Sequence, residues 1–206
     1  MRNTMTTRGF IGKRPSTDDA TRLPPGQYQT HDFPVLSKGA TPIVDLATWT
    51  FTVNNGVRPI KQWSWAEFDM LPKTTWRGDI HCVTKWSKFD TMWEGVSIDD
   101  VLRSAGIAAP TAHVLAKSYD EYDTNIPMAD LVGGQAMIAT RFNGAPLAAE
   151  HGGPARLFVP HLYFWKSAKW IRGLRFTTRD EAGFWELRGY HMYGDPWREQ
   201  RYTNDL

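Results

Sequence analysis

The sequence predicts an α+β domain whose sheets are mixed or antiparallel. Short β-like segments dominate its second half, and turn signals such as Asn143-Gly144 separate them. These segments cover residues 112–117, 135–141, 155–159 and 169–176. Few helical segments lie between them, which favours α+β architecture over a regular parallel βαβ fold.

The first half of the chain supplies the remaining strands and two short helices. Apolar residues alternate with threonines over 49–53 before Asn55-Gly56, which predicts a strand that enters a tight turn. Residues 64–67 match a capping box, and Pro72 must end the helix that they begin. A strand over 74–84 follows. A second helix begins at residues 97–100, and Gly106 closes it.

Length and composition indicate an ordinary globular protein. A chain of 206 residues with 41% hydrophobic and 22% charged residues can bury one core. We expect residues 1–30 to form a loosely ordered arm, and residues 31–206 a single domain. Residues 181–206 mix aromatic and charged side chains, so we expect them to pack across the surface of the domain.

Charge and hydropathy exclude several classes of partner. The net charge of +2 gives no argument for nucleic acid. No stretch approaches the roughly 20 apolar residues of a membrane helix, so we expect no membrane span and no export. The single cysteine cannot form an internal disulfide, and the reducing cytoplasm is therefore the expected location.

Cys82 lies where the predicted strand gives way to a loop, a common place for a functional site. Its thiolate, which Lys85 and Lys88 could stabilise, is the nucleophilic and metal-binding form. A buried, inert cysteine is the plain alternative. A cysteine hydrolase that pairs Cys82 with His151 or His161 also stays open, whereas zinc lacks a recognised ligand spacing.

A second segment rich in candidate residues runs from His151 to Trp170. The turn at residues 152–154 contains two glycines and a proline, and it lets the backbone approach a ligand closely. Arg156 and Lys169 carry the donors that a phosphate group needs. The alternative is a surface loop with solvated basic residues.

Together, residues 79–87 and 151–170 resemble the molybdopterin-binding domain of the sulfite oxidase family. The resemblance is closest to its small bacterial branch of stand-alone oxidoreductases, and it covers residues 33–202 or thereabouts. It implies the sulfite oxidase fold. It also implies a molybdenum cofactor with a single molybdopterin, bound through two dithiolene sulfurs and the thiolate of Cys82.

The resemblance also assigns roles to individual residues. Cys82 corresponds to the molybdenum ligand, and Tyr190 to a tyrosine at the site of the substrate oxo-anion. His81 and Trp86 are further candidates to line the substrate pocket. The residues implied to bind the cofactor are Ser118, His151, Arg156, Ser167, Ala168 and Lys169.

The implied reaction is two-electron oxygen-atom transfer on a small oxo-acceptor or oxo-donor, with a separate electron-transfer protein as partner. Sulfite oxidases carry an arginine before the first strand, but residues 33–37 contain none. We therefore expect a neutral or zwitterionic substrate rather than sulfite. A cysteine-dependent hydrolase or transferase without molybdenum, and a non-catalytic cofactor-binding module, stay open as alternatives.

Overall fold

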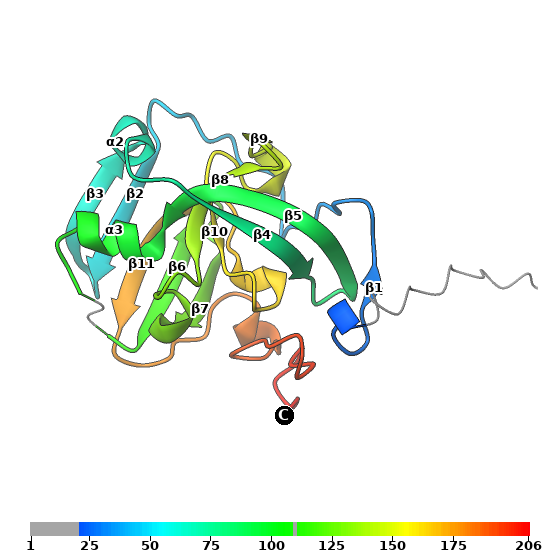
Figure 1. Ribbon diagram of the computed structural model, residues 1–206. Helices are drawn as coiled ribbons and strands as arrows, with labels where there is room; N and C mark the ends of the chain where they lie inside the picture. Colours follow the sequence, from blue (N-terminus) through cyan, green and yellow to red (C-terminus); the bar gives the residue numbers. More distant parts are fainter. Residues whose placement is uncertain (1–20, 109–110) are drawn as a thin grey trace, which may run out of the picture.

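Two β-sheets pack against each other in the computed structural model, which describes residues 21–108 and 111–206 (Figure 1). The first sheet contains β1 (Tyr28–Gln29), β4 (Thr74–His81), β5 (Trp86–Ser97), β8 (Met137–Phe142), β9 (Ala145–Pro146) and β10 (Arg156–Phe158). The second contains β2 (Thr50–Asn55), β3 (Arg58–Ser64), β6 (His113–Ser118), β7 (Asp123–Pro127) and β11 (Ile171–Thr177). Within the predicted arm, residues 1–20 lie outside the described residues.

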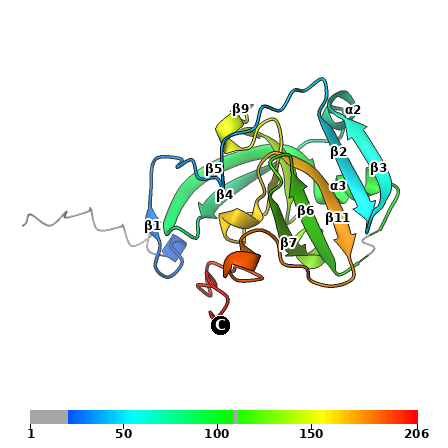
Figure 2. The same cartoon turned by 180° about the vertical axis from the view of Figure 1, so that it is seen from behind.

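Both sheets are mixed. In the first, β1 runs parallel to β5, while β4 and β8 pair with β5 in antiparallel fashion. In the second, β11 pairs parallel to β2 and antiparallel to β6, and Figure 2 shows these strands from the other side. The predicted fold class is therefore confirmed.

Short helices connect the strands. Helix α2 (Trp65–Asp69) begins with the predicted capping box, in which Ser64 and Glu67 bond each other reciprocally. Helix α3 (Ile98–Ser104) begins at Ser97, whose hydroxyl accepts from the backbone N–H of Asp100 at 3.0 Å. The 3₁₀ turns are η1 (Met128–Asp130), η2 (Ala149–His151), η3 (Phe164–Lys166) and η4 (Glu186–Arg188).

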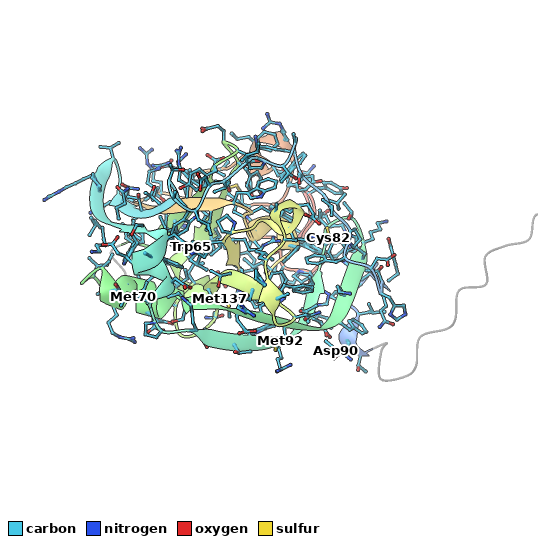
Figure 3. The ribbon with its side chains drawn as sticks, turned by 90° about the horizontal axis from the view of Figure 1, so that it is seen from above. Trp65, Met70, Cys82, Asp90, Met92 and Met137 are labelled. Atoms are coloured by element: carbon cyan, nitrogen blue, oxygen red, sulfur yellow. The ribbon has the colours of Figure 1, made fainter. Side chains whose placement is uncertain are left out.

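The strand predicted over 74–84 ends three residues early, at His81. A tight turn stops it: the N–H of Lys85 donates to the Cys82 carbonyl at 3.0 Å, and Lys85 adopts a φ of 77°. The N–H of Cys82 then donates to the carbonyl of Trp86 at 2.9 Å. Cys82 thus begins the turn between β4 and β5, at one end of the molecule (Figure 3).

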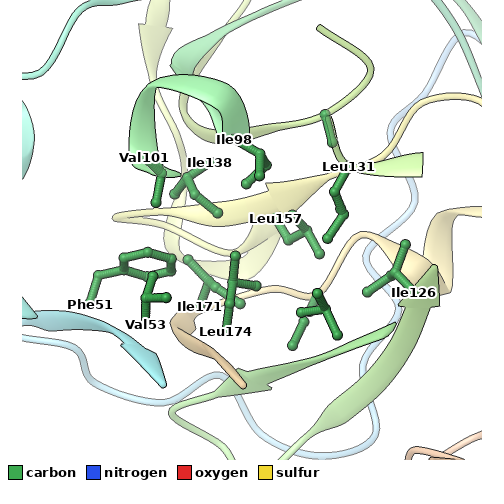
Figure 4. Close-up of a cluster of buried hydrophobic side chains, with 14 of the residues drawn as sticks. Phe51, Val53, Ile98, Val101, Ile126, Leu131, Ile138, Leu157, Ile171 and Leu174 are labelled. Carbon is green, nitrogen blue, oxygen red and sulfur yellow. The ribbon is translucent and has the colours of Figure 1, made fainter. Parts of the chain in front are cut away.

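The main core lies between the sheets and draws from both (Figure 4). Phe51, Val53 and Leu174 come from the second sheet, whereas Ile138 and Leu157 come from the first, and all are fully buried. A second apolar cluster surrounds the β4–β5 turn and includes Cys82, with Trp93, Phe158 and Tyr163 among its members. The described ranges contain no helix long and apolar enough to cross a membrane.

The core predicts a strong dependence of stability on Leu174. This side chain lies in β11 between β2 and β6, and none of it is exposed. Truncation in Leu174→Ala should cost about 2–5 kcal/mol, because it removes buried contacts and leaves a cavity. Urea unfolding measures this cost. Leu187→Ala, at a 73% exposed leucine, is the control, and equal losses in both variants would contradict the packing described here.

Candidate active site

A cavity of about 290 Å³ opens beside the β4–β5 turn. Five segments that lie far apart in the sequence form its wall: residues 33–38, the turn that begins at Cys82, residues 120–122, the loop from His151 to Trp170, and the C-terminal segment at 185–190. The cavity therefore combines residues from the strand ends with residues from the long connections.

Most of the predicted site residues meet in this cavity. Cys82, His151, Arg156, Ser167, Ala168, Lys169, Tyr190 and Trp86 all line it. Ser118 does not, although its hydroxyl is buried and has no hydrogen-bond partner among the described residues. His81 does not line it either. Its Nδ1 lies 2.8 Å from Ser87 Oγ on the other face of β4, and burial lowers its pKa to about 4.

Cys82 is only 7% exposed, and its sulfur lies 3.2 Å from the hydroxyl of Thr84. Burial raises the pKa of the thiol, and the Thr84 hydrogen bond and the charge of Arg201 partly oppose this rise. The predicted help from Lys85 and Lys88 stays a prediction. Lys88 donates to the His31 carbonyl at 2.6 Å, and the charge of Arg201, in the C-terminal segment, lowers the pKa of Cys82.

Arg156 is a buried cation without an anionic partner. It is 1% exposed, and it donates to the carbonyls of His151 at 2.8 Å and Ser167 at 2.5 Å. Its guanidinium also lies 4.1 Å from the ring centre of Phe164. No carboxylate in residues 21–108 or 111–206 forms an ion pair with it, and burial lowers its pKa to about 9. A buried charge of this kind is costly unless a ligand compensates it.

Lys169 and His151 extend the same polar wall. The ammonium of Lys169 donates to the Glu150 carbonyl at 2.6 Å and to Ser37 Oγ at 3.1 Å. Burial and then the charge of Arg156 lower the pKa of Lys169 to about 8. The His151 ring stacks on Phe33 with centroids 3.8 Å apart, and its buried Nδ1 has no partner within the described part of the chain.

We expected the two glycines after His151 to let the backbone approach a ligand, but their close contacts in the structure are with other segments of the protein. A Cβ at Gly153 would lie 2.1 Å from the carbonyl oxygen of Leu147, and a Cβ at Gly152 would lie 3.0 Å from Lys169 Cα. Gly152 also adopts a φ of 106°. The glycines thus let protein segments approach each other, and this approach places Lys169 and Arg156 side by side.

Sequence reasoning missed Lys38 and Asp120, which also line the cavity. The Lys38 ammonium donates to the Asp120 carbonyl at 2.5 Å and lies 3.8 Å from its carboxylate. Lys38 directly follows the segment in which we noted the missing arginine. The sequence signal that could have identified Lys38 was a basic residue directly after this largely apolar segment.

An aromatic wall, made of Trp165, Trp185 and Tyr190, closes another side of the cavity. Tyr190 stacks on Trp185 at 5.1 Å and meets Trp165 edge-on at 5.2 Å. Behind this wall, Glu186 accepts from Trp165 Nε1 at 2.8 Å and from the fully buried Lys166 at 2.7 Å. This buried ion pair fixes the C-terminal segment against the loop that carries Ser167 and Lys169.

The histidines do not form a nucleophile–base pair with Cys82. His161 Nε2 lies 2.9 Å from the carboxylate of Asp130, outside the cavity lining. His151 lines the cavity but makes no hydrogen bond to the thiol, whose polar partner is Thr84. The described residues also contain no group of three or more His, Cys, Asp or Glu side chains that could hold a metal ion.

The two-sheet fold contains a cavity lined by a thiol and by cations, and comparison with known proteins identifies the family of the chain. Residues 38–185 match the family described as "Oxidoreductase molybdopterin binding domain". The chain is 41% identical over 197 residues to YuiH, an uncharacterised oxidoreductase of Bacillus subtilis, covering 95% of this chain and 100% of that protein. The chain therefore belongs to the sulfite oxidase family of molybdopterin-binding oxidoreductases, and the family implies a molybdenum cofactor.

More distant relatives share only part of their length with this chain. Mitochondrial sulfite oxidase of Rattus norvegicus is 31% identical over 108 residues, which are 48% of this chain and 20% of the enzyme. The sulfane dehydrogenase SoxCD from Paracoccus pantotrophus has a similar fold, with a TM-score of 0.60 at 16% identity. That likeness covers 86% of this chain and 56% of the SoxCD chain.

The unpaired cations predict that a simple anion stabilises the cofactor-free protein. Inorganic phosphate should raise its Tm, because a ligand at about 100 times its Kd contributes about 2.7 kcal/mol to folding. Lys169→Met should reduce this rise. Lys88→Met removes the same charge outside the cavity lining and serves as the control. Equal rises in the two variants, measured by differential scanning fluorimetry, would show that the anion binds elsewhere.

Proposed function

We propose that this chain binds a molybdenum cofactor through the thiolate of Cys82 and catalyses two-electron oxygen-atom transfer on a small substrate. One observation carries the proposal: the thiol of Cys82 and the uncompensated guanidinium of Arg156 face one cavity. A soft sulfur ligand suits molybdenum, and a buried cation suits the phosphate of a pterin.

The donor set fits such a cofactor. Arg156 and Lys169 would hold the phosphate, and Lys38 adds a third cation to the same cavity. The buried Nδ1 of His151 and Nε1 of Trp86 have no partners among the described residues, so both are free to bond a polar ring. Ser167 and Ala168 would contact the pterin mainly through their backbone, since the hydroxyl of Ser167 already accepts from Val159 N–H at 2.9 Å.

When bound, the cofactor supplies the oxygen-atom transfer chemistry, and the protein orients the substrate. Tyr190 is the residue that we assign to this task. Burial raises the pKa of its hydroxyl, so the hydroxyl keeps its proton at neutral pH and can donate to a substrate oxygen. Its packing between Trp165 and Trp185 restricts the direction of that donor.

The charges that line the cavity beside Cys82 favour a neutral or zwitterionic oxide, because the buried Arg201 bonds the Val83 carbonyl from outside the cavity lining. Val83, Thr84 and Tyr190 carry no charge, and the cation Lys38 is already paired with Asp120. The cofactor phosphate would neutralise Arg156 and Lys169. A relative from Azospira oryzae, 30% identical over 151 residues, is named as a putative protein-methionine-sulfoxide reductase subunit, and an S-oxide is such a substrate.

Two-electron chemistry needs an electron carrier, and we propose a separate electron-transfer protein as the partner. The chain spans the full length of its Bacillus subtilis relative but only 57% of the Azospira oryzae relative and 20% of the rat enzyme. We therefore infer the partner from the need of the proposed reaction for an electron carrier.

We also propose a cytoplasmic location, because a reducing compartment keeps Cys82 a free thiol.

The first functional prediction concerns the metal ligand. Cys82→Ser should retain the pterin, because the residues that would hold the phosphate are unchanged, but it should lose most turnover because an alkoxide replaces the soft thiolate poorly. Pterin fluorescence after oxidation and molybdenum analysis measure the content, and steady-state assays measure the rate. A serine variant with wild-type rates would refute the ligand assignment.

The second prediction concerns the substrate. At an effective dielectric of about 20, each pair of unit charges 4 Å apart contributes on the order of 4 kcal/mol, so a doubly charged anion such as sulfite depends strongly on unpaired cations. The Tyr190 hydroxyl contributes only about 0.5–1.5 kcal/mol. With an artificial electron carrier, kcat/KM should therefore be higher for S-oxides or N-oxides than for sulfite. A clear preference for sulfite would mean that Lys38 leaves Asp120 and faces the substrate.

A further inference from the structure

Arg201 is a buried cation in the C-terminal segment that reaches the turn containing Cys82. Its side chain is only 5% exposed. Nη1 donates to the carbonyl of Val83 at 2.7 Å, and Nη2 donates to the carbonyl of Pro25 at 3.1 Å. The guanidinium also lies 4.9 Å from the ring centre of Tyr163. Arg201 does not itself line the cavity, but it joins three segments that lie far apart in the sequence.

These bonds hold the backbone of the turn from behind. Val83 directly follows Cys82, and its carbonyl is bonded by Arg201 in a buried environment. The carbonyl of Cys82 accepts from Gln27 Nε2 at 3.0 Å, and also from the N–H of Lys85. Because buried carbonyls are costly to leave unbonded, the arm and the C-terminal segment together restrict the position of the sulfur.

The charge of Arg201 is only partly neutralised. Its ion-pair partner within the described ranges is Glu199, at 3.4 Å, whose side chain is 47% exposed. Solvent screens that carboxylate, whereas the guanidinium lies in the protein interior. Val83 directly follows Cys82, so the bond from Arg201 to the Val83 carbonyl places the positive charge beside the turn that contains the thiol.

We propose that Arg201 is a positioning residue that fixes the Cys82 turn and, through its charge, raises the reduction potential of the metal bound there. This inference rests on the proposed function. A positive charge beside a metal thiolate stabilises the reduced state, which carries one more negative charge. The C-terminal segment therefore tunes the metal although it provides no ligand.

Because Arg201 and Glu199 carry opposite charges, removing each charge should shift the midpoint potential of the metal in opposite directions. In molybdenum-loaded protein, redox titration followed by the electron paramagnetic resonance of Mo(V) gives the midpoint potential. Arg201→Gln should shift this potential to a more negative value. Glu199→Gln should shift it to a more positive value. Arg201→Lys keeps the charge and should keep the potential, with lower molybdenum content because a hydrogen bond is lost.

Arg198→Gln is the matched control, because it removes the same charge from an exposed side chain three positions away. It should leave the potential unchanged. If Arg201→Gln fails to bind metal, the other two variants still decide the matter: the potential should become more positive in Glu199→Gln and stay unchanged in Arg201→Lys. Unchanged potentials, or shifts of one sign in Arg201→Gln and Glu199→Gln, would overturn the role of Arg201 alone. Wild-type protein without molybdenum would overturn the proposed function as well.

Discussion

The guanidinium of Arg156 is a buried charge without an anionic partner, and the rest of the site depends on this constraint. It bonds only carbonyls and lies against the ring of Phe164. Folding the chain around such a cation costs free energy that a packed apolar core would not require. Lys169 lies close enough to add to that cost, since the charge of Arg156 lowers the pKa of Lys169 and both cations lower the pKa of His151. We propose that the anionic cofactor offsets this cost.

Cys82 is the second centre of the structure, and segments from both ends of the chain meet there. Gln27 and Arg201 bond the carbonyls of Cys82 and Val83, and β1 pairs with the first residues of β5. Tyr190 and Trp185 then bring the C-terminal segment to the cavity wall. The site is therefore assembled by long-range contacts, even though Cys82 itself lies in a local turn between two neighbouring strands.

Sequence reasoning predicted the elements whose signals are local. The capping box at Ser64 and the strand over β2 follow from short patterns, whereas most of the candidate site residues came from the family resemblance. It missed β5, although buried Phe89, Thr91 and Trp93 alternate there with less buried neighbours, which is a strand signal. It could not find Asp120 and Arg201 by pattern, because only the tertiary fold brings them to Lys38 and Val83, more than eighty positions away.

The central claim is that a thiolate and a buried cation form one cofactor site, and it is tested most directly by the contents of the purified protein. Elemental analysis for molybdenum, combined with quantification of oxidised pterin, should find metal and pterin in equal amounts that follow the protein through purification. In Arg156→Ala, the molybdenum and pterin contents should fall together, by about one to two orders of magnitude when the cofactor supply is limiting. Active protein that contains neither molybdenum nor pterin would contradict the account.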